Sequence, residues 1–377
     1  MKVFNFSEKD LTPERFIKDR HTLSAVTMSK PSKISAAHRF KEDLQKRHGG
    51  IKKRKIFVSK GNLKYSQDKI KPLLETMFHS KCNTDHILSY IKGKNPHTII
   101  REECVGKDML IKFDIRKYYD NISGKMIYNS LKKLGFNHQG ATHITKLCTV
   151  KIGNKYSLQQ GSSVSPVLSN IVGYFYIDKP VQSYLEEIEK QYPKLEITYK
   201  RFCDNIGIWV DGPVPTGFSD QLKEEIKRRI KTFKVHDWYT IRGNHPKLAQ
   251  TFLGVTLNSQ MKIQRVRYDK IRAILFNSII DWTLQNALKY FRENGDDRFD
   301  GVYSGSDTIE KFHERMGGYV NYVKQVNQKQ GLRLEKLLEA SKKCTWMPLS
   351  NVDILEKIKK YTNDDESVQE YMSKIFT

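Results

Sequence analysis

Two aspartates are the residues of this 377-residue chain whose types and surroundings best suit metal-dependent chemistry. Asp114 directly follows Phe113 at the end of a short apolar run, and Asp204 lies in a turn between hydrophobic segments that end at Phe202 and restart at Ile206. Carboxylates are hard oxygen ligands for divalent cations, and paired cations stabilise the attacking and leaving oxygens of a phosphoryl transfer. A strand end and a tight turn can bring such carboxylates to one point, so both are candidate catalytic ligands.

A loop rich in small residues separates the two aspartates. It begins at Gln160 and Gly161 and continues through Pro166 to Asn170. Glycine permits close approach of the backbone to a ligand, and proline restricts the freedom of the loop. Asp is a common turn residue, so either aspartate alone indicates little. The combination of two aspartates with this loop between them favours a composite site.

In this order and at this spacing, residues 111–122, 159–170 and 199–210 resemble motifs A, B and C of the reverse transcriptase palm. The resemblance is to bacterial and phage enzymes of the retron, group II intron-like and defence-associated kinds. It implies a right-hand polymerase of the α+β class, with fingers, palm and helical thumb. It also implies an RNA-directed DNA polymerase, a nucleotidyltransferase that extends a primer with deoxynucleotides.

Segments outside the palm motifs extend the resemblance to roughly residues 50–325. The fingers element R-x-I-x-x-P followed by L-K-x-x-Q-x-x-I is matched by Arg54, Ile56, Leu63, Lys64, Gln67 and Ile70. Ser59 stands where proline is usual. The match implies that Arg54 faces the incoming triphosphate, because a guanidinium suits phosphate oxygens. Residues 251–258 resemble motif E, and residues 316–323 resemble a thumb segment.

Apolar patterning predicts the organisation of the chain. Short apolar runs alternate with amphipathic stretches at 126–134 and 170–188, which favours an α+β palm. Beyond residue 260, apolar residues recur at helical spacing. The predicted regions are a helical N-terminal extension (1–50), fingers (51–104), a palm with finger insertions (105–258), and a helical thumb with the C-terminal region (259–377).

The resemblance also assigns ligands for two Mg²⁺ ions. Asp114 and Asp204 would hold both ions, and the carbonyl of Ile115 would complete the ion on the nucleotide side. The familiar motif C has two consecutive aspartates, whereas here Asn205 follows Asp204. An amide oxygen can still contact a metal, so Asn205 stays in the predicted catalytic and ligand set. The lost charge weakens ion binding and shifts the preference toward Mn²⁺.

The nucleotide site follows from the same resemblance. Tyr119 would lie under the sugar and exclude a 2′-hydroxyl, while its neighbour Tyr118 is a candidate core residue. Gln160 and Gly161 would pack on the nucleotide and the template base. No motif D lysine can be assigned, and the unranked candidates for that role are Lys234, Arg242 and Lys247.

Composition favours a polyanionic partner. The chain has 66 Lys and Arg against 42 Asp and Glu, a formal net charge of +24, and a pI of about 9.6. Such a field attracts phosphate backbones. The expected partners are an RNA template, most simply a structured non-coding RNA, together with dNTPs and the DNA product. Whether a protein partner or an oligomer is needed stays open.

The chain shows no apolar run of the ~20 residues that a membrane span needs, and its N-terminus has no signal-peptide pattern. No membrane partner is therefore expected. The five cysteines form no CxxC pair and no metal-ligand spacing, which favours a reduced cytoplasmic protein.

Two alternatives stay open beside a reverse transcriptase that serves antiphage defence with a dedicated RNA. One is an RNA-dependent RNA polymerase, against which Tyr119 and the Gln160–Gly161 loop argue. The other is a degenerate reverse transcriptase retained as a nucleic-acid scaffold, for which Asn205 argues.

Overall fold

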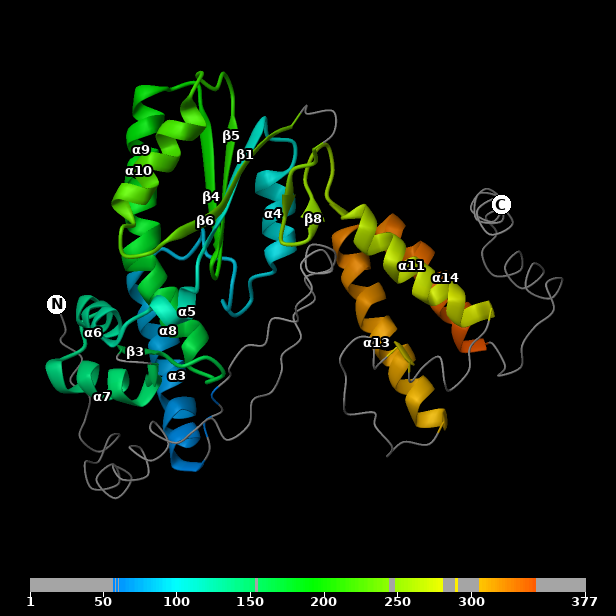
Figure 1. Cartoon of the computed structure of the whole chain (residues 1–377), viewed down its shortest axis with the longest axis horizontal. Helices are drawn as coiled ribbons and strands as arrows, with labels where there is room; N and C mark the ends of the chain where they lie inside the picture. Colours follow the sequence, from blue (N-terminus) through cyan, green and yellow to red (C-terminus); the bar gives the residue numbers. More distant parts are fainter. Residues whose placement is uncertain are drawn as a thin grey trace. The chain divides into compact units, whose positions relative to one another are not determined.

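The computed structural model describes residues 57, 59, 61–152, 155–243, 248–280, 289, 290 and 305–343 (Figure 1). The chain divides into two compact units. The first takes its residues from Met1–Ile99 and Lys107–Leu248, and the second from Ile100–Gly106 and Ala249–Thr377. Helices and antiparallel strands occur together, as predicted for the α+β class. The expected N-terminal extension and Arg54 lie outside the described residues.

The first unit is built on a four-stranded antiparallel sheet with the strand order β4-β5-β1-β6. Its strands are β1 (Met109–Ile115), β4 (Glu196–Phe202), β5 (Asn205–Asp211) and β6 (Val235–Arg242). Side chains alternate between the two faces of a strand. Ile111, Phe113 and Ile115 of β1 are buried in the main hydrophobic core, so Lys112 and Asp114 belong to the opposite face.

Helices cover the core face of this sheet, as Figure 1 shows for α9 and α10. The helices of the first unit, with α4 extending into the second, are α3 (Gly61–Lys81), α4 (Pro96–Cys104), α5 (Tyr118–Asn121), α6 (Gly124–Lys133), α7 (His138–Cys148), α8 (Ser165–Gly173), α9 (Lys179–Gln191) and α10 (Phe218–Arg229). A hairpin of β2 (Thr149–Ile152) and β3 (Lys155–Leu158) joins α7 to the loop before α8.

The two predicted amphipathic stretches are helical. Residues 126–134 correspond to α6, which the Ser123 side chain caps by accepting a hydrogen bond from the Met126 backbone N–H. Residues 170–188 run through α8, a π-helical turn η2 (Tyr174–Asp178) and α9 without a break. A π-helical turn changes the direction of the side chains that follow it. Here it places the carboxylate of Asp178 in the protein interior.

The second unit contains a small three-stranded sheet and a helical layer. Its elements are β7 (Thr251–Phe252), β8 (Val255–Thr256), β9 (Lys262–Ile263), α11 (Arg265–Ile280), α13 (Gly305–Val326) and α14 (Gln328–Lys343). Residues 251–258, which resemble motif E, include the β7–β8 turn, where Leu253 and Gly254 both have positive φ. The apolar stripe predicted beyond residue 260 is buried: Leu275 and Ile279 in α11 lie in the core, as do Leu334 and Leu338 in α14.

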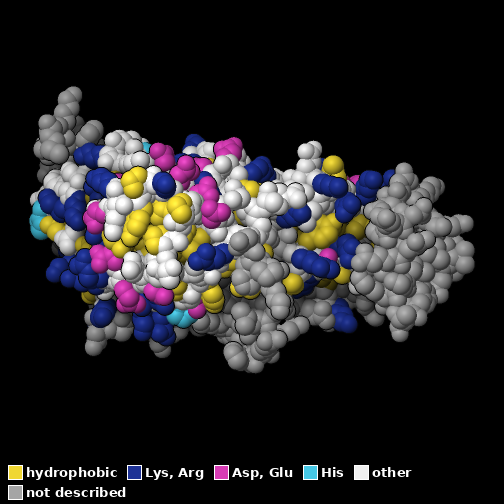
Figure 2. All heavy atoms as spheres, turned by 90° about the horizontal axis from the view of Figure 1, so that it is seen from above, with side chains coloured by type: hydrophobic (Ala, Val, Ile, Leu, Met, Phe, Trp, Pro, Cys, Tyr) yellow, Lys and Arg dark blue, Asp and Glu magenta, His cyan; other side chains and the backbone are white. Residues whose placement is uncertain are grey.

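Charged side chains lie over the described surface of the chain. Figure 2 shows Lys and Arg side chains interspersed with acidic side chains and with hydrophobic patches on one face. Within the described residues, no helix combines the length and the apolar character that a membrane span requires.

Candidate active site

Of the two predicted aspartates, Asp114 lies near the end of β1 and Asp204 lies in the turn between β4 and β5. Asp114 pairs with Asn205, the first residue of β5, and the next residue, Ile115, donates its backbone N–H to the Asp204 carbonyl at 2.9 Å. The end of β1 and the β4–β5 turn are therefore in direct backbone contact. The structure brings together all four predicted metal-site residues, Asp114, Ile115, Asp204 and Asn205.

The β4–β5 turn is a tight connection of two residues between Phe202 and Asn205. Cys203 adopts a left-handed conformation with a φ of 58°. This conformation is unfavourable for a residue with a Cβ atom, because the Cβ crowds the carbonyl oxygen. The Asp204 side chain is half-buried, and the Asn205 amide donates a hydrogen bond to its Oδ1 at 3.0 Å. The amide of Asn205 is thus oriented by the carboxylate of its neighbour.

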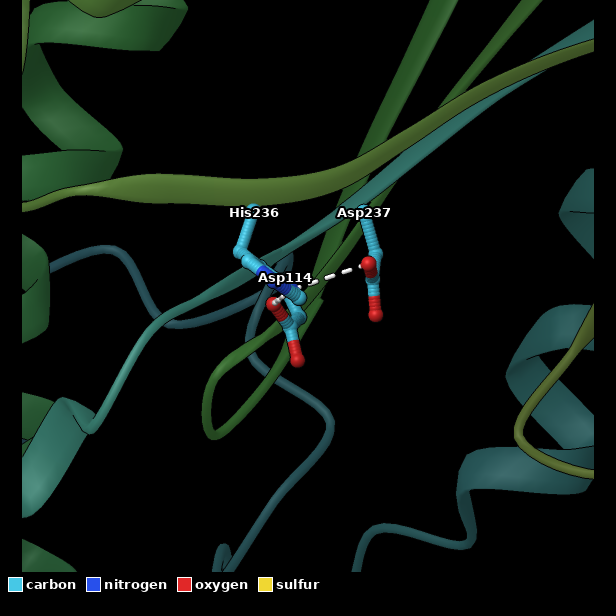
Figure 3. Close-up of side chains that lie close together, drawn as sticks. All are labelled: Asp114, His236 and Asp237. Carbon is cyan, nitrogen blue, oxygen red and sulfur yellow. Dashed lines mark ion pairs between the residues drawn. The ribbon is translucent and has the colours of Figure 1, made fainter. Parts of the chain in front are cut away.

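On the other side of β1, strand β6 adds a carboxylate and an imidazole. Lys112 pairs with Tyr239 and Asp114 with His236, so two steps along β1 oppose three steps along β6. The extra residue forms a β-bulge, and Asp237 within it has a φ of 51°. The bulge turns the side chain of Asp237 toward the same point as those of Asp114 and His236 (Figure 3).

The ligand atoms of these three side chains all lie within 4.8 Å of one another. His236 Nδ1 is 3.4 Å from Asp114 Oδ1 and 2.9 Å from Asp237 Oδ1. All three side chains remain open to solvent, with exposed fractions of 35% for Asp114, 48% for His236 and 44% for Asp237. The group offers two carboxylates and one imidazole, a donor set that suits Mn²⁺ as well as Mg²⁺.

The sequence alone does not single out His236 and Asp237 as site residues. Both stand in the stretch Val235–Arg242, which has no alternating pattern of apolar and polar residues. The only signal available was an aspartate inside a run rich in β-branched and aromatic residues, where aspartate is unusual. The bulge that aims its carboxylate has no signature of its own in this sequence.

The two tyrosines after β1 occupy different environments. Tyr118 is buried, donates its hydroxyl to the Ser169 carbonyl at 2.6 Å and packs on Phe233 at 5.5 Å between ring centroids. Tyr119 is half-buried, and its hydroxyl lies 3.4 Å from Ser169 Oγ. Burial raises the pKa of the Tyr119 hydroxyl, which therefore stays neutral. Tyr118 is a core residue, whereas Tyr119 is only partly buried.

The loop before α8 contacts the segment after β1. Gln160 is half-buried and donates its side-chain amide to Asp120 Oδ1 at 3.2 Å. Gly161 is exposed, with a φ of 103°, which favours glycine. Both predicted loop residues therefore lie beside α5, the short helix that carries Tyr119.

Buried glutamines connect this loop to the region predicted as fingers. Gln67 of α3 donates its amide to the Leu147 carbonyl at 2.8 Å, and its Oε1 accepts from Ser162 at 2.7 Å. Gln159 donates to the Phe57 carbonyl at 2.9 Å and to Ser59 Oγ at 2.8 Å. Ser59, which stands where proline is usual, thus has a specific role in holding the loop.

The three unranked candidates for a motif D cation differ in position. The carbonyl of Lys234 accepts the Arg116 N–H at 2.9 Å, so this residue lies near the end of β1 that carries Asp114. Arg242 pairs with Met109 at the opposite end of β1. Lys247 lies outside the described residues. Of the two described candidates, Lys234 is on the side of the candidate site.

Among solved structures, the chain resembles the telomerase of Candida albicans in complex with a fragment of telomeric RNA. The TM-score is 0.39 at 12% identity, over 82% of this chain and 56% of that one. It also resembles the apo telomerase of Candida tropicalis, with a TM-score of 0.38 at 12% identity over 81% of this chain and 60% of that one.

In sequence, no family model matches the chain. A search of curated proteins finds the putative COX1/OXI3 intron 1 protein of Saccharomyces cerevisiae, 26% identical over 284 residues. The match covers 69% of this chain but 32% of the relative, so the chain spans about a third of that protein's length. The chain is thus similar to a yeast intron protein over about two thirds of its own length.

Proposed function

We propose that the chain is a reverse transcriptase, an RNA-directed DNA polymerase that works by nucleotidyl transfer at two divalent ions. The observation that carries this proposal is the junction of β1 with the β4–β5 turn, where the Ile115 N–H bonds to the Asp204 carbonyl. The backbones that carry two aspartates far apart in the sequence thereby meet at the end of the two central strands of the sheet. The loop at Gln160 and Gly161, which resembles motif B, lies beside α5, and α5 carries Tyr119.

The residues present fit a divalent cation. Asp114, His236 and Asp237 supply oxygen and nitrogen donors within 4.8 Å of one another, and the turn that carries Asp204 adjoins the end of β1 on the side opposite β6. Bound divalent ions supply charge stabilisation for the attacking and leaving oxygens. Asp114 would hold such ions with Asp204 and the Ile115 carbonyl. Asp237 adds a negative charge that Asn205 does not supply, so Mn²⁺ or Mg²⁺ would still meet three carboxylates.

Other residues of the chain bind and orient the nucleotide. Tyr119, held beside Ser169, would present its ring to the sugar and exclude a 2′-hydroxyl by contact. Gly161 leaves room for the backbone to approach a base, and Gln160 is oriented by Asp120. These residues act by positioning, which is the main contribution of a protein to phosphoryl transfer.

The template in this proposal is RNA, and the simplest source is a structured non-coding RNA that serves antiphage defence. The net charge of +24 supports a polyanionic partner. Sequencing the nucleic acid that copurifies with the full chain identifies the template directly. A single abundant RNA species supports a dedicated template, whereas a mixture that mirrors total cellular RNA contradicts it.

Primer extension tests the polymerase proposal. Full-length parent protein is supplied with an RNA template, a DNA primer, dNTPs and either Mg²⁺ or Mn²⁺, beside Asp204→Asn and the control Asp220→Asn. Asp220 is an exposed residue in the first turn of α10, so its substitution removes the same charge at a remote place. We expect incorporation by the parent and by the control alone. Equal incorporation by Asp204→Asn contradicts the assignment of the site.

A nucleic-acid scaffold is the second candidate function. It is favoured by the hydrogen bond from the Asn205 amide to Asp204 Oδ1, which occupies one of the carboxylate oxygens that a cation needs. A scaffold binds RNA with an affinity that falls steeply as salt rises, because phosphate contacts release counterions. It incorporates nothing in either metal. Salt-sensitive RNA binding without incorporation therefore supports the scaffold over the enzyme.

A further inference from the structure

A buried polar network lies behind the β4–β5 turn, and the proposed chemistry does not use it. At its centre Arg201 of β4 and Asp178 of η2 are both fully buried. Arg201 donates to both carboxylate oxygens of Asp178, from Nε at 2.7 Å and from Nη2 at 2.8 Å. Burial of two charges is costly unless each is paired and fully hydrogen-bonded. Such a pair in the interior calls for a reason other than stability.

The network ends on the residue that precedes Asp204. Arg201 Nη1 donates to the Cys203 carbonyl at 3.1 Å, and Ser89 Oγ accepts the Cys203 backbone N–H at 2.9 Å. Asn170 of α8 links the two, since its Oδ1 accepts from Ser89 Oγ at 3.2 Å and from Arg201 Nη1 at 3.3 Å. Both backbone polar groups of Cys203 are therefore bound by buried side chains, one from Arg201 two residues earlier and one from Ser89, 114 positions away in the chain.

Cys203 is the residue of the turn that most needs such support. Its φ of 58° is disfavoured for a residue with a Cβ, and strained backbone persists only where the surroundings over-determine it. Beyond Cys203, the Asp204 carbonyl is held by the Ile115 N–H. The main chain is thus fixed on both sides of the Asp204 side chain, which itself stays half-buried and open to a ligand.

The guanidinium of Arg201 packs closely against Gly173 of α8. A Cβ added at Gly173 of α8 would lie 2.7 Å from Arg201 Cζ and 2.5 Å from the Tyr118 hydroxyl. A glycine at this place lets the helix approach the planar group closely. His86 and Tyr199 also contact Asp178, at 3.1 Å and 2.7 Å. The carboxylate therefore has polar partners from three residues, Arg201, His86 and Tyr199.

We infer that Ser89 and Arg201 are positioning residues, which hold Cys203 in its left-handed conformation and thereby fix Asp204 for ion binding. The catalytic consequence of this inference rests on the proposed function. The hydrogen bonds that hold the turn exist whether or not the chain is a polymerase. Ser89 is the better residue to change. Its loss removes a neutral hydroxyl that accepts from the Cys203 N–H and donates to Asn170, whereas replacing Arg201 leaves the buried Asp178 carboxylate without its main partner.

The first test is amide hydrogen exchange of full-length Ser89→Ala, followed by mass spectrometry of peptides that contain Cys203. Ser130→Ala is the matched control, because Ser130 is also fully buried in the first unit and its hydroxyl makes no hydrogen bond within the described residues. We expect the Cys203 amide to exchange about tenfold faster in Ser89→Ala, as loss of one buried hydrogen bond implies. In the control Ser130→Ala, the exchange rate of the Cys203 amide should be unchanged.

The second test asks whether the held turn matters for the cation. Mn²⁺ binding is followed by electron paramagnetic resonance, and primer extension is measured against metal concentration. We expect Ser89→Ala to raise the concentration of Mn²⁺ needed for half-saturation by about tenfold, the scale of effects from groups that orient ligands. The same shift should appear in the metal dependence of primer extension. Ser130→Ala should not move either value.

A double-mutant cycle with Cys203→Gly separates the left-handed turn from general core damage. Glycine adopts positive φ without crowding, so a turn with glycine needs less support. Ser89→Ala should therefore cost less in metal affinity in the Cys203→Gly background than in the parent. An equal cost in both backgrounds overturns the inference, and so does unchanged exchange of the Cys203 amide in Ser89→Ala.

The outcomes also separate this inference from the proposed function. If the parent binds Mn²⁺ but incorporates no nucleotide with either metal, the polymerase proposal fails, while exchange and Mn²⁺ binding still decide the positioning role. If the parent polymerises and Ser89→Ala matches it in metal requirement, the polymerase proposal stands and the positioning role is overturned.

Discussion

Strand β1 carries Asp114 between two neighbours that support the site in different ways. On one side, the β4–β5 turn presents Asp204 from a backbone that Ser89 and Arg201 bind within the interior. On the other side, the bulge of β6 presents Asp237 from a strand whose residues His236 and Asp237 are exposed. Each side contains a non-glycine residue with positive φ. In the turn it is Cys203, which precedes Asp204, and in the bulge it is Asp237 itself.

The difference shows two ways to hold a carboxylate at a cation site. A buried network fixes the main chain next to Asp204 through hydrogen bonds that solvent does not reach. An exposed bulge leaves Asp237 adjustable, since solvent competes for its hydrogen bonds and screens its charge. We therefore expect changes at the turn to have larger effects than changes at the bulge.

The largest expected effect is on the chemistry itself. Asp204→Asn or Asp114→Asn removes an anionic ligand from the ion site, and we expect primer extension to fall on the order of a thousandfold, as loss of preorganised charge stabilisation does. Steady-state incorporation of dNTPs measures this loss, with circular dichroism to check that folding is retained. A parent-like rate for either variant would remove that aspartate from the site.

The next effect is on stability. Asp178→Ala leaves the buried Arg201 without its carboxylate, and we expect a loss of about 3–5 kcal/mol in the free energy of unfolding at pH 7. Burial by itself raises the pKa of Asp178, but Arg201 and His86 outweigh burial and hold the pKa at about 2. Denaturant titration of the parent, of Asp178→Ala and of the control Asp220→Asn measures the difference.

This stability has a defined dependence on pH. The folded pKa lies below the value of about 3.9 for an unfolded aspartate, so the contribution is fully present above that value. It is lost as the pH falls through about 2. The gap between the parent and Asp178→Ala should therefore narrow in acid. A gap that stays constant from pH 7 down to pH 2 would show that the charge of Asp178 does not stabilise the folded state.

A smaller effect is expected on the selection of deoxynucleotides over ribonucleotides, for which Tyr119 is the candidate residue. Tyr119→Ala removes the ring from beside Ser169, and we expect discrimination against ribonucleotides to fall by about 10–100-fold, the scale of a steric contact in a pocket. Tyr118→Ala should instead lower the melting temperature, because Tyr118 is buried against Phe233. Paired extension assays with dNTPs and NTPs decide the matter, and equal discrimination by parent and Tyr119→Ala would exclude the steric role.

The smallest effect is expected at the bulge. Asp237→Gly removes a carboxylate but relieves a left-handed conformation that costs a residue with a Cβ about 1–2 kcal/mol. We expect the free energy of unfolding to stay the same or rise. The Mn²⁺ concentration needed for half-saturation should increase by about fivefold, which is a smaller change than the tenfold effects typical of groups that orient ligands. Asn205→Asp in the same background should restore part of the metal affinity. Unchanged metal affinity in Asp237→Gly would leave Asp204 and Asp114 as the only carboxylates of the site.

Much of the candidate site was predictable because its residues lie in short segments with recognisable order. Asp114, Asp204 and the loop at Gln160 follow apolar runs or turns whose spacing is visible in the sequence, and the structure places them around one end of β1. The helices at 126–134 and 170–188 were predictable for a similar reason, since their apolar periodicity is local. Arg54 stays a prediction, as it lies outside the described residues.

By itself the sequence determined the residue types at the site, the mixture of helices and strands, and the positive charge, all of which are local or additive properties. Only the tertiary structure decided that Asp237 joins Asp114, because a one-residue bulge reverses the direction of a side chain without a local signal. It also decided that Ser89 and Arg201 hold Cys203. These contacts depend on hydrogen bonds between buried groups, up to 114 positions apart in the chain, that form only when the sheet and α8 pack together.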